Sequence, residues 1–266
     1  MKHFKIISFL IFTISLFNCN TTTNKNPINK SKNQENETYA IKNVNIISMT
    51  KENKVIENST IVIKENKIYS INKSIPKNST IIDGKGKWLM PGLIDMHVHN
   101  LASSSPFVMY PTKGPLVNYE TQDLMTLYVA NGITTVFELS ARPEHIGQRN
   151  EITRGNVIGP RIALAALIDG KNANMIASNS SDGRQAVRIA KGEQYEFIKV
   201  YSKLNEETFK AIIDEAKQQK MKVVGHIPNV FEGKPAKDFF IPHFGLIAHA
   251  EEFSKQTDDY SYEKAQ

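Results

Sequence analysis

The chain has 266 residues, enough for one large domain or for a medium domain with a small companion. Hydrophobic residues make up 40% of it and charged residues 23%, the composition of an ordinary soluble globular protein. The net charge is +6, but the lysines are spread along the chain without a basic stripe interleaved with aromatic residues, so no nucleic-acid partner is expected. A single cysteine excludes an internal disulfide bond.

The N-terminus has the pattern of an export signal. Lys2 and Lys5 are followed by an apolar run of twelve residues, Ile6 to Phe17. This run is too short to span a bilayer comfortably, but its length is typical of a signal peptide.

A lipidation site is predicted at the end of that signal. Leu16 stands three residues before Cys19, which resembles the lipobox of bacterial lipoproteins, although Phe17 and Asn18 are bulkier than the small residues usual there. The pattern predicts a signal peptide over residues 1–19, lipid attachment at Cys19, and a place in the bacterial cell envelope, on the periplasmic or outer-membrane face. The alternatives are a plain N-terminal anchor or a secretory signal with a stray cysteine.

Two segments follow. Residues 20–38 are almost wholly polar, which predicts a flexible tether because such a segment has little apolar surface to bury. Residues 39–89 predict a small β unit, half of a β-sandwich, because short runs rich in β-branched residues alternate with turn-forming clusters. Its expected strands are 40–47, 60–63, 67–71 and 80–82.

From residue 90 to residue 266 the pattern alternates between strands and helices, which predicts an α/β fold with a parallel sheet and helices outside it. A TIM-type (β/α)₈ barrel, with only about six strands present, is favoured over an open doubly wound sheet because no glycine-rich phosphate loop is found, although periodicity alone does not separate them. The expected strands are 93–98, 133–139, 162–168, 197–201, 222–227 and 246–250.

Two helices have the clearest patterns. Residues 206–220 place Phe209, Ile212, Ile213 and Ala216 at helical spacing, with Asn205 as the expected N-cap. Residues 121–131 place three apolar side chains on one stripe, with a glycine at the expected helix end; these residues are Leu124, Leu127, Tyr128 and Gly132.

The central chemical signal is the pair His97 and His99, which follows Pro91-Gly92-Leu93-Ile94-Asp95. Residues two apart on a strand point to the same side, so both imidazoles face one way at the carboxyl end of the strand, where barrel enzymes place their active sites. Two imidazoles in that arrangement are suited to bind one divalent metal ion.

Several stretches in the same order resemble the amidohydrolase superfamily, close to its imidazolonepropionase-like and Xaa-Pro-dipeptidase-like members. The similarity covers the chain from about Tyr39 to Phe253. It is carried by residues 82–92, 131–136, 158–161, 197–201, 223–227 and 247–252.

The resemblance implies a set of metal ligands at the ends of four strands: His97, His99, Lys199, His226 and His249. It implies one or two divalent ions, zinc being the expected metal. In a binuclear centre Lys199 would be carbamylated and would bridge the ions; the alternative is an unmodified lysine beside a single ion. Tyr201 is expected either to contact the substrate or to pack. The long segment 100–119 is expected to be a substrate-facing lid or a mobile loop.

The family also carries an aspartate at the end of an eighth strand. The chain ends shortly after its sixth expected strand, and Asp258 and Asp259 follow His249 too closely to fill that position. We therefore expect the sequence to be a fragment of a longer gene product, the alternative being a natural truncation without turnover.

The expected function is a metal-dependent hydrolase that acts on C–N bonds of a small substrate, a dipeptide or a cyclic amide, through metal-activated water. Two alternatives stay open: a non-catalytic lipoprotein that uses the incomplete barrel as a binding module, and a lactonase or phosphotriesterase with the same metal centre.

Overall fold

The structure is a computed structural model that describes residues 38–52, 54–100, 121–171 and 177–256. It divides into two compact units, Met1–Met90 and Pro91–Gln266. The predicted signal peptide, Cys19, all of the tether except Thr38, most of the predicted lid segment, and Asp258 and Asp259 lie outside the described residues.

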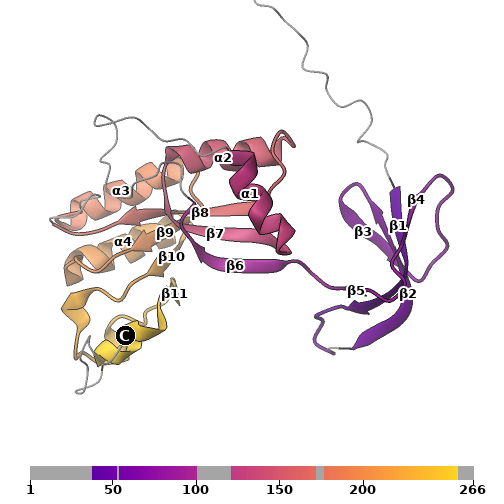
Figure 1. Cartoon of the computed structure of the whole chain (residues 1–266). Helices are drawn as coiled ribbons and strands as arrows, with labels where there is room; N and C mark the ends of the chain where they lie inside the picture. Colours follow the sequence, from indigo (N-terminus) through magenta and orange to yellow (C-terminus); the bar gives the residue numbers. More distant parts are fainter. Residues whose placement is uncertain (1–37, 53, 101–120, 172–176, 257–266) are drawn as a thin grey trace, which may run out of the picture. The chain divides into compact units, whose positions relative to one another are not determined.

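The first unit is a sheet of short strands (Figure 1). Strand β1 pairs with β2 in antiparallel fashion and with β4 and β5 in parallel, giving the order β3-β2-β1-β4. Val44, Ile46 and Ile61 form its buried core. The strands are β1 (Thr38–Ile47), β2 (Val55–Lys64), β3 (Lys67–Ile71), β4 (Thr80–Asp83) and β5 (Trp88–Leu89).

Strand β2 begins earlier than the sequence pattern indicates. The polar residues Glu57 and Asn58 interrupt its alternation, yet the backbone there still pairs with β1 through a shifted register. Asn58 has a φ of 44°, a left-handed conformation that asparagine tolerates better than most residues. This irregular ladder explains why the sequence predicts only residues 60–63.

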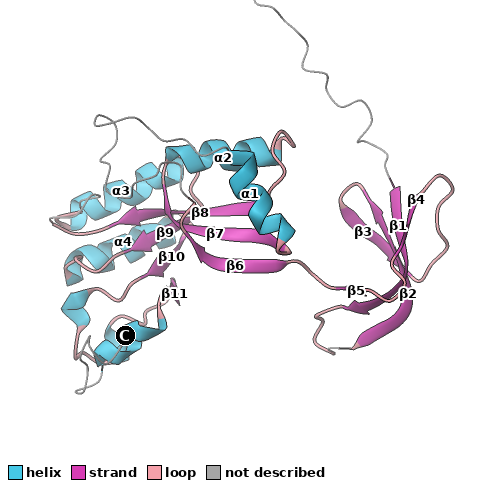
Figure 2. Cartoon of the chain, viewed as in Figure 1, coloured by secondary structure: helices cyan, strands magenta, loops and turns pink. Residues whose placement is uncertain are grey.

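The second unit alternates strands and helices, as Figure 2 shows. Its strands are β6 (Leu93–Val98), β7 (Ile133–Ala141), β8 (Arg161–Ile168), β9 (Phe197–Val200), β10 (Lys222–Gly225) and β11 (Phe244–Ile247). Its α-helices are α1 (Thr121–Ala130), α2 (Pro143–Thr153), α3 (Ser180–Gly192) and α4 (Glu206–Gln218), and its 3₁₀ helices are η1 (Asn229–Phe231), η2 (Ala236–Asp238) and η3 (Ala250–Gln256).

All neighbouring strands of this unit are parallel, in the order β11-β10-β9-β8-β7-β6. Each strand therefore lies beside the next one in sequence, which is the topology of a (β/α) barrel wall rather than of a doubly wound sheet. The predicted α/β fold, with about six strands of a barrel and a separate small sheet, is confirmed.

The two faces of the parallel sheet bury different clusters. Ile198 and Val200 belong to the large core that includes helix residues such as Phe209 and Ile212. Phe197 packs instead on a smaller cluster formed by Phe137, Leu139, Ala165 and Val224. Because side chains alternate along a strand, Lys199 lies on the same face as this smaller cluster, away from the helices.

Helix α4 follows its pattern. The side chain of Asn205 accepts a hydrogen bond from the backbone N–H of Thr208 at 2.8 Å and so caps the helix. The four predicted core residues, Phe209, Ile212, Ile213 and Ala216, are all buried.

Helix α1 corrects one expectation about its apolar stripe. Leu127 is 62% exposed, whereas Met125 is fully buried and Leu124 and Tyr128 pack beside it. The buried stripe therefore keeps the predicted positions 124 and 128 but includes Met125 in place of Leu127. None of the helices in the described part of the chain has the length and hydropathy needed to cross a membrane.

Candidate metal centre

The five predicted ligand positions lie at the carboxyl ends of parallel strands. His97 is the penultimate residue of β6, and His99 directly follows that strand. Lys199 is the penultimate residue of β9. His226 directly follows β10, and His249 comes two residues after the end of β11. All these ends face the same edge of the sheet because the strands are parallel.

The curl of the sheet brings the outermost strands together at this edge. Strands β6 and β11 are at opposite ends of the order, five strand spacings apart, which in a flat sheet is about 24 Å. The rings of His97 and His249 nevertheless lie 4.8 Å apart, centroid to centroid. The parallel sheet therefore curves like a barrel wall, and its edge residues converge.

The four histidines form a continuous group, called the histidine cluster here: His97, His99, His226 and His249. The centroids of His99 and His97 are 5.0 Å apart, and those of His249 and His226 are 4.8 Å apart. Together with the contact between His97 and His249, these distances link all four rings.

Part of this cluster has the spacing of metal ligands. Two nitrogens bonded at about 2.0–2.1 Å to one tetrahedral ion lie about 3.3 Å apart. The Nε2 atoms of His97 and His99 are 3.1 Å apart. No group of three or more His, Cys, Asp or Glu side chains among the described residues is placed closely enough to hold one ion. The donor types and one pair distance thus fit a divalent metal, while a complete ligand shell is not formed.

The electrostatic environment favours neutral imidazoles. Burial lowers the pKa of His97, and the nearby positive charges of Lys199, His99 and His249 lower it further. The pKa of His249 is also lowered, chiefly by burial and then by His226. A neutral imidazole has a lone pair for a metal, so both residues are suited to ligation near neutral pH.

Lys199 is 1% exposed and is one of the largest fully buried side chains among the described residues. Burial lowers its pKa to about 8, against the smaller opposing influence of Glu252 and Glu138. A buried lysine with a reduced pKa at the mouth of a barrel is typical of a functional group rather than of a packing residue.

A buried carboxylate that sequence reasoning missed lies beside His99. Glu138 of β7 is fully buried and accepts a hydrogen bond from the backbone N–H of Ser140 at 2.8 Å and one from the backbone N–H of Asn100. Its Oε1 is 3.4 Å from Nδ1 of His99. A lone acidic residue inside the apolar run 133–139 was the signal that could have identified it.

His145, which is not one of the predicted ligands, supports the same region. It is buried on α2, its Nδ1 accepts a hydrogen bond from the backbone N–H of Arg142 at 2.9 Å, and its Nε2 contacts the backbone oxygen of Asn100. The hydroxyl of Tyr128 donates to Oδ1 of Asn100 at 2.7 Å. These contacts fix the chain just after His99.

Tyr201 packs against the histidine cluster. Its ring centroid is 4.0 Å from that of His226, and Nζ of Lys199 is 5.8 Å from its ring centroid. The tyrosine is 37% exposed, so one part contacts the cluster and another faces solvent. The substrate contact predicted for it stays a prediction.

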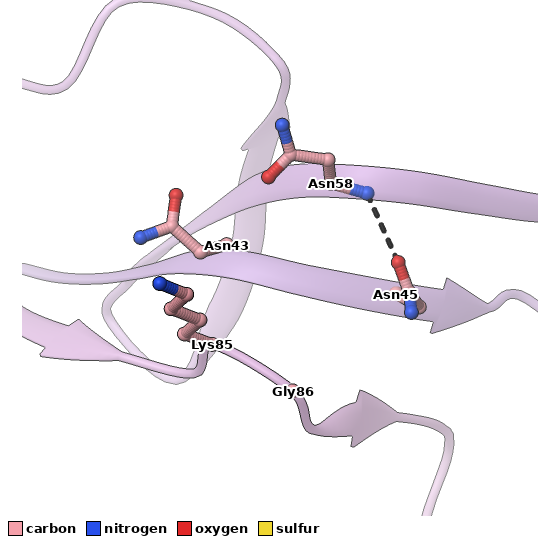
Figure 3. A pocket seen from close by; sticks show the side chains of 5 residues that line it. All are labelled: Asn43, Asn45, Asn58, Lys85 and Gly86. Atoms are coloured by element: carbon pink, nitrogen blue, oxygen red, sulfur yellow. Dashed lines mark hydrogen bonds between the residues drawn. The ribbon is translucent and has the colours of Figure 1, made fainter.

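A pocket in the first unit contains none of the predicted ligands. It is lined by Asn43, Asn45, Asn58, Lys85 and Gly86, and the backbone N–H of Asn58 donates to Oδ1 of Asn45 at 3.1 Å (Figure 3). These lining residues include no histidine, cysteine or carboxylate, the side chains that bind zinc. The histidine cluster is therefore the better candidate site.

No protein-family model matches the chain. Among characterised proteins, it is similar to two 5-methylthioadenosine/S-adenosylhomocysteine deaminases. The one from Caldanaerobacter subterraneus is 28% identical over 185 residues, 58% of this chain and 42% of that protein. The one from Bacillus thuringiensis is 38% identical over 65 residues, 23% of this chain and 15% of that protein. An α-D-ribose 1-methylphosphonate 5-triphosphate diphosphatase from Escherichia coli is 31% identical over 101 residues, 37% of this chain and 25% of that protein.

Solved structures support the same relationship. A protein assigned as a prolidase from Bifidobacterium longum has a TM-score of 0.62 at 23% identity, with 82% of this chain and 57% of that chain covered. A Xaa-Pro dipeptidase has a TM-score of 0.55 at 21% identity, with 71% and 56% covered. The chain thus spans about half or less of the length of these relatives.

These relatives and neighbours are hydrolytic enzymes, and enzymes of this superfamily use divalent metals. The resemblance predicted from the sequence motifs is confirmed: the chain has the fold of the amidohydrolase superfamily, and its structural neighbours are members of that superfamily.

Proposed function

We propose that the chain supplies the metal-binding wall of a hydrolase that cleaves C–N bonds of small molecules with activated water. The observation that carries the proposal is the convergence of the four imidazoles of the histidine cluster and buried Lys199 at one edge of a curled parallel sheet. A divalent ion held there would polarise a carbonyl and lower the pKa of a water molecule.

In this proposal the histidine cluster holds one or two zinc ions. The lowered pKa values of His97 and His249 keep lone pairs available for this role. The reduced pKa of Lys199, about 8, leaves about one amine in ten neutral at pH 7, far more than for an exposed lysine. The neutral amine is the form that reacts with carbon dioxide, which favours a carbamylated Lys199 bridging two ions over an unmodified lysine beside one.

The proposed substrate has a C–N bond next to a polarisable carbon, as in a dipeptide or a cyclic amide. Two kinds of relative support this class. Deaminases and prolidases differ in substrate, but both break a C–N bond with water. Tyr201, with its exposed edge beside His226, is the side chain proposed to meet the substrate.

Metal binding and turnover by the full chain test the proposal. We expect zinc to bind in equilibrium dialysis and His97→Asn to lose most of that zinc. His243→Asn is the matched control, because His243 lies outside the cluster and asparagine tolerates its φ of 80°. Release of proline from Xaa-Pro dipeptides by the zinc-loaded chain, abolished by His97→Asn, would support the C–N class. Equal zinc content in wild type and His97→Asn would contradict the proposed centre.

A second candidate is hydrolysis of phosphotriesters or lactones at the same centre. The similarity to a diphosphatase favours it, since that protein's name describes cleavage between phosphates. A phosphotriester or lactone hydrolysed faster than any amide, again lost in His97→Asn, would select this alternative. Zinc binding without turnover of any of these substrates would favour the non-catalytic binding module.

We also propose that the protein is tethered to the cell envelope through a lipid on Cys19. The support is the sequence alone: two early lysines, a short apolar run and the cysteine after it. Expression in a bacterial host with a radiolabelled fatty acid should label the wild type but not Cys19→Ser; equal labelling of both would contradict the proposal.

A further inference from the structure

The pocket of the first unit, called the amide pocket here, has the size of a small-molecule site. Its lining residues are Asn43, Asn45, Asn58, Lys85 and Gly86 (Figure 3). Its volume is about 400 Å³, within the range of roughly 300–1,000 Å³ that small-molecule pockets have. All of these residues belong to the first unit, and none of them belongs to the histidine cluster. The role of the amide pocket can therefore be tested apart from the metal centre.

Irregular pairing of β1 with β2 turns asparagine side chains toward the pocket. The register of the two strands shifts between Ile41 and Val44 and again between Val44 and Ile46. At these irregularities Asn43 has a φ of 59° and Asn58 a φ of 44°. Residues at a bulge leave the regular ladder, which changes the direction of their side chains. The bulges thus bring amides from two strands to one pocket.

Two of the three amides are held in a defined orientation. Nδ2 of Asn43 donates to Oδ1 of Asp83 at 3.0 Å, which leaves the side-chain oxygen of Asn43 to accept a hydrogen bond. Oδ1 of Asn45 accepts from the backbone N–H of Asn58 at 3.1 Å, which leaves the NH₂ group of Asn45 to donate. The pocket therefore presents an oriented acceptor and an oriented donor from one strand.

Lys85 adds a second donor without making the pocket strongly positive. Its backbone N–H donates to Oδ1 of Asp83 at 3.0 Å, so a carboxylate lies close to this lysine. The pKa of Asp83 is lowered, chiefly by the hydrogen bond from Asn43, and the charge of Lys85 contributes. The negative charge of Asp83 offsets that of the ammonium. A neutral ligand with several hydrogen-bonding groups therefore matches this pocket better than an anion does.

An exposed tryptophan lies next to these polar groups. Trp88 pairs with Asn45 in the parallel ladder of β1 and β5, so their side chains share one face. Val44 and Ile46, on either side of Asn45, belong to the buried core, so the shared face is the outer one. Trp88 is 58% exposed. Its indole ring is a large apolar surface whose electron-rich face attracts C–H groups.

We propose that the amide pocket and Trp88 together bind a neutral sugar. A pyranose ring has C–H groups on its faces, which the indole ring can contact, and hydroxyl groups around its rim. Each hydroxyl both donates and accepts, so neighbouring hydroxyls match the oxygen of Asn43, the NH₂ group of Asn45 and the ammonium of Lys85. This sugar site goes beyond the proposed hydrolase function and does not depend on it.

Fluorescence of the full wild-type chain tests the site directly, because Trp88 is the single tryptophan of the chain. The probes are methyl β-D-glucoside, methyl α-D-mannoside and methyl N-acetyl-β-D-glucosaminide. We expect at least one of them to change the emission with a dissociation constant on the order of 1 mM, as for a small ligand with few contacts. Unchanged emission with all three sugars, at about ten times that concentration, overturns the proposal.

Replacing Asn45 by aspartate tests the predicted donor. The aspartate oxygen can still accept from the N–H of Asn58, but the NH₂ group is lost, so the affinity for the sugar should fall about tenfold or more. Asn78→Asp is the matched control, because it adds the same charge at an exposed position outside the pocket, where aspartate tolerates the φ of 69°. It should bind the sugar like wild type. Equal affinities of Asn45→Asp and wild type overturn the proposal.

Two substitutions of Trp88 test the aromatic contact. Trp88→Ala lacks the fluorophore, so its binding is followed by saturation-transfer NMR of the sugar. Its affinity should fall about tenfold or more, whereas Trp88→Phe should keep part of the affinity because it keeps a ring. Full affinity in Trp88→Ala overturns the proposal. His97→Asn should bind the sugar like wild type, so a failure of the proposed metal centre is distinguishable from a failure of this site.

Discussion

Replacing Lys199 by methionine tests whether this buried charge destabilises the folded protein. The residue is 1% exposed, and burial lowers its pKa from 10.5 to about 8. At about 1.36 kcal/mol per pKa unit, this shift corresponds to roughly 3 kcal/mol of penalty for carrying the charge in the folded state. Methionine has a similar length and no charge, so Lys199→Met should remove the penalty with little change in packing.

The pH dependence has a defined sign. Below pH 8 both folded and unfolded lysine carry the proton, and the full penalty is present. Between pH 8 and 10.5 the unfolded state binds more protons than the folded state, so the stability of the wild type rises with pH. The advantage of Lys199→Met should therefore be about 3 kcal/mol at pH 7 and should vanish as the pH approaches 10.5.

Urea unfolding of metal-free protein in carbon-dioxide-free buffer, at pH 7 and pH 10, measures this advantage. Lys222→Met is the matched control, because Lys222 is exposed on β10, and it should change the free energy of unfolding by less than about 0.5 kcal/mol. The reasoning is refuted if Lys199→Met is less stable than wild type at pH 7, since the ammonium would then be net stabilising through Glu252 and Glu138.

Three further substitutions probe the scaffold of the site. Gly225 has a φ of 137°, and an added Cβ would lie 2.1 Å from the backbone oxygen of Val200. Gly225→Ala should therefore lower the free energy of unfolding by about 3 kcal/mol or more, measured by thermal unfolding. The control Gly192→Ala, where an added Cβ meets open space, should be neutral or stabilising. Equal melting temperatures for the two variants would contradict this account. Glu138→Ala leaves the backbone N–H groups of Asn100 and Ser140 without their acceptor. It should lower the free energy of unfolding in urea by about 2–3 kcal/mol. A loss below about 0.5 kcal/mol would show that these groups find other partners. Asn205→Ala removes the N-cap of α4 and should cost about 1 kcal/mol by the same measurement, a neutral result meaning that the cap contributes nothing.

The sequence was a good guide to β7, β8, β9 and β10 because their apolar runs are largely buried on both faces. Their ends were less well predicted. Strands β9 and β10 stop at Val200 and Gly225, one and two residues before the predicted ends. Hydropathy does not record where a hydrogen-bonded ladder ends.

The two helices without individual predictions show the limit of periodicity. Helix α2 buries only His145, and α3 buries the small residues Gly183 and Ala190 with Val187. Neither has the wide stripe of large apolar side chains that makes α4 recognisable. These helices are stabilised by tertiary contacts, among them the hydrogen bonds of Arg188 on α3 to Glu215 on α4 at 2.8 and 2.9 Å.

The histidines could be predicted, but the contacts that buried carboxylates make with them could not. A His-x-His pair on a strand and histidines after later strands are readable because parallel strands share one edge. Glu138 is 39 residues from His99, and Glu252 is 26 residues from His226. Their contacts depend on the curl of the sheet and on the 3₁₀ turn after β11, neither of which has a local sequence signal.

Anomalous diffraction at the zinc edge from crystals of the full chain grown with zinc tests the central claim most directly. The account predicts a peak within about 2.0–2.1 Å of imidazole nitrogens from both His97 and His99, at the edge of the sheet that also carries His226, His249 and Lys199. Zinc bound only at other positions, with the histidine cluster empty at saturating metal, would contradict it.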